Sequence, residues 1–333
     1  MPQIDKPLQP EVLLHCWSLV RDVLGRKIDL LELPDLAAKF GFKGVEWLDR
    51  LMPSFDPVYW DELNAAQNQA GLKTAAFSLS MDLSAGPQAV AAQKDRAQAI
   101  ISLCPRLGVK ALRVSIGGHG PVSLARLILF TQKGGDREGE PEALSCLGRG
   151  LYKLMLRLPR KPRHAGHRAD PLALQSAAWS LQPLSRQAAN LGIIMGVENH
   201  FGLTSHPEDL LALLDLVAGD PANRTGHGNQ NAGWAERSPM SGSGLGVCLD
   251  TGNHPVELDP AVAARLLAPH AVHVHWKIKS DPPTKDELQV LAFHANALKA
   301  AGFSGLISVE YEGPGYGLTG AKAGLDLLNK FMR

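Results

Sequence analysis

The sequence is poor in cysteine and has no run of about 18 apolar residues that could cross a membrane. Its four cysteines are scattered over 333 residues and form no C-x-x-C pair, which excludes a zinc ribbon and a disulfide framework. Isolated cysteines are typical of a reducing compartment. The first ten residues also lack the charged and then apolar pattern of a signal peptide, so we expect a cytoplasmic protein without a membrane span.

The net charge is also small, at +1. A chain so close to neutral has no overall attraction to nucleic acids or acidic membranes, so neither partner is expected. Apolar residues make up 45% of the chain and charged residues 20%, which is the composition of a folded globular protein. The length suits one α/β barrel with insertions better than one sandwich.

Apolar segments that are typical of buried strands alternate with helical segments along the chain. Eight strand segments are predicted, at residues 12–19, 44–48, 72–80, 110–118, 193–199, 246–253, 271–278 and 306–313. About eight helices follow them, and several end at a glycine that would form the C-cap. Parallel strands joined by helices form a closed barrel or an open sheet. Eight units at this length favour a single (β/α)8 TIM barrel over residues 1–333.

Two segments interrupt this alternation, at about 119–170 after the fourth strand and 220–244 before the sixth. The first is too long for an ordinary loop. It contains a basic run at 157–168, which is either a solvated part of the insertion or a site for an anion or a partner. The second is polar and rich in glycine. Between the two insertions, Ser205 followed by Glu208 predicts a helix that starts with a capping box.

Four of the predicted strands carry a residue of a metal-binding type near the C-terminal end. These residues are Glu198 in IIMGVENH, Asp250 in GVCLDTGN, His275 in AVHVHWKI and Glu310 in LISVEYEG. The active site of a TIM barrel lies at the C-terminal ends of its strands. The ligand positions and the strand pattern are independent signals, and together they predict four ligands at one end of one barrel.

Three carboxylates and one imidazole can hold a divalent cation, with Mn²⁺ or Mg²⁺ favoured and Co²⁺, Fe²⁺ or Zn²⁺ as alternatives. The open coordination positions of this cation suit the hydroxyl and carbonyl oxygens of a sugar, and the cation would stabilise an enediolate. Glu198 and Glu310 come from strands well apart on the ring. They could face opposite sides of a bound ketose, so that one removes a proton and the other returns it.

Each residue alone has a plainer interpretation. A single Glu at a strand end is usually solvated or in a salt bridge, and a single His is more often structural, so the prediction depends on the recurrence in four units. His273 and His275 point to the same face of their strand, and either could be the ligand. We predict His275 because it lies nearer the C-terminal end. Arg113, in the fourth strand, is predicted to form a salt bridge inside the barrel.

The motifs VENH, CLDTGN, HVHWK and SVEYEG, in this order, resemble the xylose-isomerase-like sugar phosphate isomerase/epimerase superfamily. Each motif alone is weak, and the combination is fairly specific. The resemblance runs from GFKGVEW at residues 41–47 to the final strand, outside the two insertions. It implies a TIM barrel with one divalent metal and a small sugar or sugar-derived substrate, and it suggests a homo-oligomer.

The resemblance also implies roles for individual residues. The implied metal ligands are Glu198, Asp250, His275 and Glu310, of which Glu198 and Glu310 would double as acid and base. Substrate contacts are implied or expected for the residues around them, namely His200, Lys277, Asn253, Glu46 and His119. Lys277 would either stabilise a developing oxyanion or form a salt bridge with a strand-end carboxylate.

Two departures from the family pattern bear on the reaction. Ketose 3-epimerases of the superfamily usually carry a His three residues after the metal Asp, where this chain has Asn253, and an Arg shortly after the metal His, where this chain reads HWKIKSD. Both departures argue against epimerisation of a free ketohexose, and the HWK pattern resembles the inosose dehydratase-like branches. An isomerase or epimerase of a sugar, a sugar phosphate or an inositol-type keto-sugar is the first hypothesis. A dehydratase or lyase, of the inosose dehydratase or C-glycoside-cleaving kind, is the second.

Two further classes stay open. A non-catalytic sugar-binding or partner subunit would have no need of intact metal ligands. An apurinic endonuclease type would need three zinc ions, a His-rich ligand set and a basic surface facing DNA. The near-neutral charge and the DTGN motif argue against the nuclease.

Overall fold

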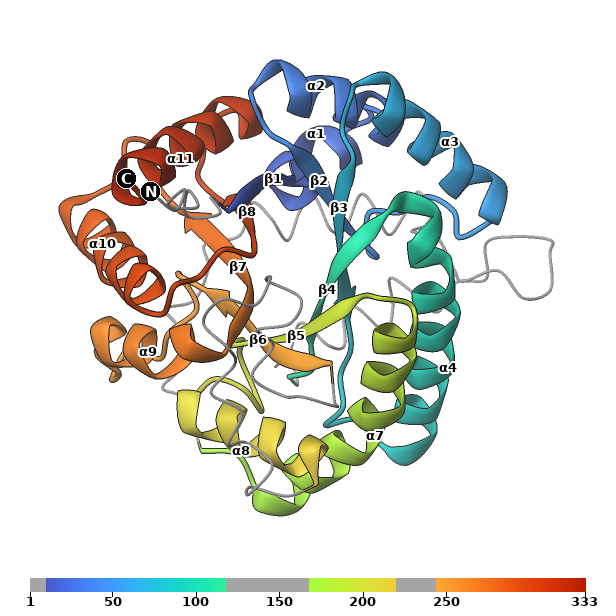
Figure 1. The fold of residues 1–333 in the computed structure, drawn as a ribbon, viewed down its shortest axis with the longest axis vertical. Helices are drawn as coiled ribbons and strands as arrows, with labels where there is room; N and C mark the ends of the chain where they lie inside the picture. Colours follow the sequence, from blue (N-terminus) through green and yellow to red (C-terminus); the bar gives the residue numbers. More distant parts are fainter. Residues whose placement is uncertain (1–9, 118–167, 220–243) are drawn as a thin grey trace, which may run out of the picture.

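Every apolar strand segment predicted from the sequence contributes to one closed parallel barrel in the computed structural model, which describes residues 10–117, 168–219 and 244–333. Both predicted insertions lie almost wholly outside the described residues, as does His119. Each strand pairs with its neighbour in chain order, and β1 pairs with β8 to close the ring (Figure 1). The (β/α)8 prediction is confirmed.

The strands are short and buried on both faces. Their bounds are β1 Glu11–His15, β2 Gly44–Leu48, β3 Thr74–Ser80, β4 Val109–Ser115, β5 Ile194–Glu198, β6 Leu245–Asp250, β7 Ala271–Ile278 and β8 Leu306–Tyr311. The first strand ends at His15, and Cys16–Leu19 form a 3-10 helix instead of the predicted extension to residue 19. The His15 side chain causes this, because its Nδ1 accepts the Trp17 backbone N–H at 3.0 Å and caps the turn.

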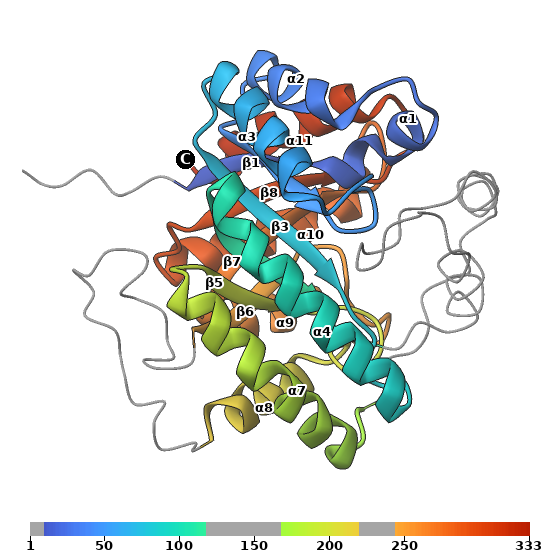
Figure 2. The ribbon, with the colours of Figure 1, turned by 90° about the vertical axis from the view of Figure 1, so that its right-hand side faces the viewer.

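Helices cover the outside of the ring. Their bounds are α1 Val20–Leu24, α2 Leu33–Lys39, α3 Pro57–Gln69, α4 Pro87–Leu103, α7 Pro171–Asn190, α8 Pro207–Ala218, α9 Pro260–Leu267, α10 Lys285–Ala300 and α11 Gly317–Phe331. Helices α4, α7 and α8 lie side by side along one flank (Figures 1 and 2). In the part of the chain that the structure describes, no helix is both long and apolar enough to span a bilayer.

Local sequence sets where many helices begin. Asp56, Asp170 and Asp259 each precede a proline at the first helical position, and each carboxylate accepts a backbone N–H in the first turn. Helix α8 corrects a prediction. It begins at Pro207 with His206 as its N-cap, and the predicted Ser205 cap is wrong because the Ser205 hydroxyl donates to the Gly202 carbonyl instead.

The barrel interior changes from apolar to polar along its axis. Four apolar side chains, Leu13, Ala76, Ala111 and Leu306, form a small cluster of their own inside the ring. Because strand side chains alternate, the next inward positions on these strands, two residues further along, are His15, Ser78, Arg113 and Ser308. All four are buried. The ring is therefore apolar at one level and polar above it, toward the C-terminal ends of the strands.

A stacked histidine pair joins α10 to the turn after β6. The His254 and His294 rings lie 4.9 Å apart with an interplanar angle of 23°. His294 is fully buried, and its Nδ1 lies 2.8 Å from the Val290 carbonyl in the preceding turn of α10, which it can reach only as a donor. Burial lowers the pKa of His294 to about 4. The native protein therefore holds this ring neutral.

The His294 environment predicts acid sensitivity of the fold. The unfolded chain takes up the proton near pH 6.5, and the folded chain does so only near pH 4. Stability from this residue is complete above pH 6.5 and is lost as the pH falls toward 4, with about 2 kcal/mol lost between pH 7.5 and 5. In urea unfolding at pH 7.5 and at pH 5, the free energy of unfolding should fall by about 2 kcal/mol less in His294→Phe than in wild type. An equal loss in both proteins would contradict the prediction.

Candidate metal centre

The four predicted metal ligands meet at one end of the barrel. Glu198 and Asp250 are the last residues of β5 and β6, while His275 and Glu310 lie near the ends of β7 and β8. All four side chains are buried. Strand register contributes directly, because Asp250 is paired with His275 between β6 and β7. The recurrence of ligands in four successive strands therefore corresponds to a real cluster.

The Nδ1 atom of His275 lies at the centre of this cluster. It is 3.1 Å from Glu198 Oε1, 3.7 Å from Glu310 Oε2 and 3.9 Å from Asp250 Oδ2. Ligand atoms bound to one Mg²⁺ or similar cation at about 2.1 Å lie roughly 3–4 Å from one another. Ligand atoms of Glu198, Asp250 and His275 also lie mutually within 4.8 Å. Donor types and spacing both fit a divalent cation.

Two positively charged side chains balance the negative charge of the carboxylates. The Lys277 ammonium lies 2.8 Å from Asp250 Oδ2 and 3.2 Å from Glu310 Oε2, with Glu312 at 3.7 Å. Of the two predicted alternatives for Lys277, the salt bridge is the one present in this structure. The Arg113 guanidinium pairs with Glu198 inside the barrel, which confirms the predicted salt bridge.

The two predicted acid/base carboxylates have opposite electrostatic environments. Burial raises the pKa of Glu310 to about 7, although the Lys277 ammonium opposes the shift. Burial acts in the same direction on Glu198, but the Arg113 guanidinium and the nearby imidazoles outweigh it and hold the pKa of Glu198 well below its usual range. Near neutral pH, Glu198 is charged, while Glu310 can exchange a proton.

The turn after β6 fixes Asp250. The Gly252 N–H donates to Asp250 Oδ1 at 2.7 Å, and the Asn253 amide donates to Asp250 Oδ2 at 3.0 Å. The Asn199 side chain accepts the Asp250 N–H and donates to the carbonyls of Asp250 and Asn253. Asn199 was not predicted. The sequence feature that could have indicated Asn199 is its position directly after Glu198, from which its side chain reaches the end of the neighbouring strand.

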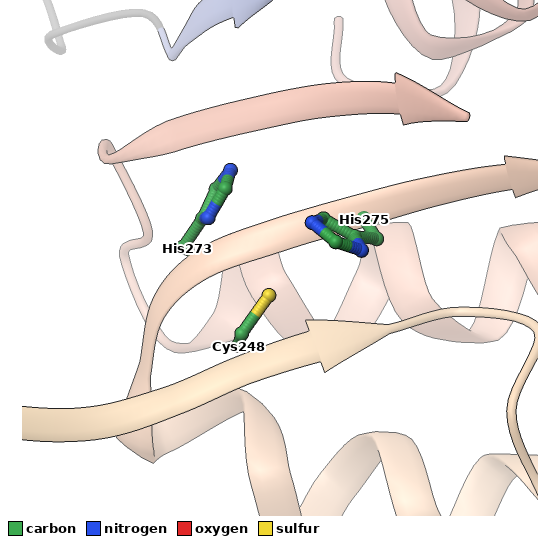
Figure 3. Close-up of side chains that lie close together, drawn as sticks. All are labelled: Cys248, His273 and His275. Carbon is green, nitrogen blue, oxygen red and sulfur yellow. The ribbon is translucent and has the colours of Figure 1, made fainter. Parts of the chain in front are cut away.

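A second polar layer lies deeper in the barrel, beneath His275. Glu46 is fully buried there, with Oε1 3.0 Å from His275 Nε2 and Oε2 3.3 Å from His273 Nε2. The Ser78 hydroxyl donates to Glu46 Oε1 at 2.6 Å. Figure 3 shows Cys248 on β6 beside His273 and His275 on β7, all within the barrel. His15, Ser78, Cys248 and Ser308 of this layer were not predicted.

The remaining predicted substrate residues lie around the cluster. His200 follows β5, with Nε2 3.8 Å from Glu198 Oε2, and burial lowers the pKa of His200 to about 3. The Asn253 amide oxygen accepts from Lys277 Nζ at 3.3 Å. Both residues therefore border the carboxylates, whereas Glu46 is separated from them by the His275 ring.

Comparisons with known proteins agree with this architecture. The sequence profile of the xylose isomerase-like TIM barrel family matches residues 34–331. The structure of an L-ribulose 3-epimerase superposes with a TM-score of 0.62 at 16% identity, over 97% of this chain and 95% of that one. The D-allulose 3-epimerase of Methylomonas sp. in complex with D-allulose gives 0.58 at 16% identity, over 97% and 98%.

A third solved structure bears on the metal. The xylose isomerase-like TIM barrel protein of Mycobacterium smegmatis in complex with magnesium gives a TM-score of 0.58 at 15% identity, over 97% of this chain and 98% of that one. None of the curated proteins compared with the chain matches it. At these identities the solved structures confirm the barrel fold.

Proposed function

The chain belongs to the xylose isomerase-like TIM barrel family, and on that premise we propose that it is a sugar isomerase or epimerase that uses one divalent cation. One observation carries the proposal: three carboxylates surround His275 Nδ1 at 3.1–3.9 Å, at the C-terminal ends of the barrel strands. The similar structures, which include a 3-epimerase in complex with D-allulose, support a small sugar as the substrate class.

The cation would be held by Glu198, Asp250, His275 and Glu310. This mainly oxygen donor set favours Mn²⁺ or Mg²⁺, while the imidazole also admits Co²⁺, Fe²⁺ or Zn²⁺. When bound, it would supply Lewis-acid chemistry, holding substrate oxygens and stabilising the negative charge left by loss of a proton. Asn199 and Asn253 support this site by fixing Asp250 in one orientation.

The chain's own carboxylates would move the proton. Glu198 and Glu310 approach from β5 and β8, with β6 and β7 between them on the ring. One carboxylate takes the proton from the carbon next to the substrate carbonyl, so that a C–H bond breaks and a carboxyl O–H bond forms. The other carboxyl group delivers a proton to the product carbon. Both side chains are buried, which shields the exchanging protons from bulk water.

Substrate orientation would come from polar groups at the rim. The Lys277 ammonium, between Asp250 and Glu310, can donate to a substrate oxygen that becomes negative. His200 and Asn253 border the same carboxylates and can bind hydroxyl groups. Of the other predicted contacts, His119 lies outside the described residues, and Glu46 is separated from the carboxylates by the His275 ring, so we do not propose Glu46 as a substrate contact.

A dehydratase or lyase is the second candidate, because the position of the Lys277 ammonium favours it. Lys277 Nζ lies 3.3 Å from the Asn253 amide oxygen and 3.2 Å from Glu310 Oε2. A proton donor beside a carboxylate could protonate a departing hydroxyl group after the same first proton removal. The two reactions differ in product, because the lyase releases water or a leaving group and an epimerase does not.

Metal analysis together with proton exchange tests the proposal. We expect about one Mn, Mg, Co, Fe or Zn ion per purified chain and its loss in Asp250→Ala. In deuterated water, wild type should exchange a carbon-bound proton of a ketose such as D-allulose, L-ribulose or a phosphorylated ketose, or of an inosose. Asp250→Ala should not.

Other outcomes separate the alternatives. Loss of water from the substrate would select the dehydratase. Three zinc ions per chain would select the nuclease. A wild-type protein that takes up no divalent metal after reconstitution would overturn the enzymatic proposal and leave a non-catalytic binding subunit.

A further inference from the structure

The imidazole of His275 is held from both sides by carboxylates. Its Nδ1 faces the cluster of Glu198, Asp250 and Glu310, and its Nε2 lies 3.0 Å from Glu46 Oε1 on the opposite side. His275 and Glu46 are both fully buried. A neutral imidazole has one nitrogen with a proton and one with a free electron pair, so only one of these sides can receive a cation.

The residues around Glu46 Oε1 provide hydrogen-bond donors. The Ser78 hydroxyl donates to Oε1, and His273 Nε2 lies 3.3 Å from Oε2. His15 accepts the Trp17 backbone N–H at Nδ1, so its Nε2 carries the hydrogen, 3.6 Å from Glu46 Oε1. Ser78 and His15 thus present hydrogen atoms toward Oε1, the atom that faces His275 Nε2, so this oxygen acts as an acceptor. The same reasoning removes His15 from the candidate ligands, although it lies in a cluster with Glu46 and His275.

We propose that Glu46 is a positioning residue that accepts the Nε2–H of His275 and thereby points the Nδ1 electron pair at the metal centre. This inference rests on the proposed function. A carboxylate behind a metal-binding histidine fixes both the tautomer and the ring orientation, and loss of such a partner commonly weakens metal binding 10–100-fold. Full burial beneath His275 suits this role better than a contact with substrate.

The position of Glu46 in the barrel explains how it can orient the His275 ring. Glu46 lies on β2, and His275 lies on β7, so the contact spans the barrel interior. Strands β2 and β7 do not pair with each other. Glu46 therefore sets the ring plane from a direction that no ligand on β5, β6 or β8 can reach.

The test is the affinity of the metal-free protein for Mn²⁺, measured by titration with detection of free Mn²⁺. Glu46→Gln should bind Mn²⁺ about 10–100-fold more weakly than wild type. Ser308→Ala is the matched control, because it removes the hydroxyl that contacts His273 in the same buried layer at 2.9 Å and leaves the Glu46–His275 contact intact. It should bind Mn²⁺ as wild type does. Glu46→Asp, which keeps the charge and withdraws the carboxylate, should also lose affinity and serves if Glu46→Gln does not fold.

A second readout separates positioning from a general loss of stability. In the Zn²⁺-loaded protein, nitrogen NMR of the His275 ring should place the hydrogen on Nε2 and the metal on Nδ1, and the Nε2–H resonance should shift in Glu46→Asp. A purely structural Glu46 would change the melting temperature without changing this resonance. Metal on Nε2 would overturn the inference.

The measured Mn²⁺ affinities test the proposal as well. If wild type binds Mn²⁺ and both Glu46 variants bind it within about twofold of wild type, the positioning role is overturned and the proposed function stands. If wild type itself binds no Mn²⁺ or Zn²⁺, the proposed function fails and the positioning role fails with it.

Discussion

Replacement of Lys277 by methionine is expected to destabilise the metal-free protein by about 3–5 kcal/mol, as removal of one partner from a buried ion pair commonly does. Lys277 is only 6% exposed, and its ammonium lies within 4 Å of Asp250, Glu310 and Glu312. Without it, three carboxylates lose their common counter-ion. Urea unfolding in the presence of a chelator measures the loss.

The matched control for this prediction is Lys279→Met. Lys279 is the next lysine along the chain, and its ammonium binds the Gly252 carbonyl, so its removal should cost about 1 kcal/mol. Saturating Mn²⁺ should recover much of the stability of Lys277→Met, because a bound divalent cation restores positive charge beside Asp250 and Glu310. Equal losses in the two variants, or no effect of Mn²⁺, would show that the ammonium does not balance these carboxylates.

Replacement of Glu310 by glutamine is expected to lower kcat about 10²–10⁴-fold, the usual contribution of a general acid or base. Glutamine keeps the shape of the side chain but can neither take nor return a proton. Glu198, Asp250 and His275, whose ligand atoms lie within 4.8 Å of one another, should retain part of the Mn²⁺ affinity. Turnover and solvent deuterium exchange on the best substrate measure the effect.

Glu312→Gln provides the comparison for Glu310→Gln. Glu312 lies 3.7 Å from the same Lys277 ammonium but is not one of the proposed ligands. Its replacement removes a carboxylate beside the same ammonium and should lower kcat less than tenfold, below the usual acid/base contribution. If Glu310→Gln retained wild-type exchange, the acid/base role would belong to other residues, with Glu198 the first to test.

The barrel fold could be predicted because its determinants are local. Eight apolar segments alternate with helical segments, and Asp-Pro pairs at residues 56–57, 170–171 and 259–260 mark helix starts. Two of the errors arose where one side chain formed a local hydrogen bond that the pattern did not indicate. His15 caps a 3-10 turn and ends β1 early, and Ser205 donates to Gly202 rather than capping α8.

The cluster of the four proposed ligands could be predicted because each of these residues lies near the end of its own strand. The support of His275 by Glu46 could not, because β2 and β7 are neighbours neither along the chain nor around the ring. Which inward side chains meet across a barrel depends on strand tilt and stagger, which no single segment encodes. A salt bridge for Arg113 was expected, but its partner was not; Arg113 on β4 pairs with Glu198 at the end of the adjacent strand β5.

The division of the site along the chain has a consequence for protein synthesis. All four proposed ligands come from β5 to β8, whereas Glu46 and Arg113 come from β2 and β4. A ribosome releases the N-terminal half first. Glu46 and Arg113 therefore emerge before His275 and Glu198, which they contact in the complete barrel, and β1 cannot close onto β8 until residues 306–311 have been made. A cation at the proposed site would therefore be bound only after nearly all of the chain has been made, and it could not guide the early steps of folding.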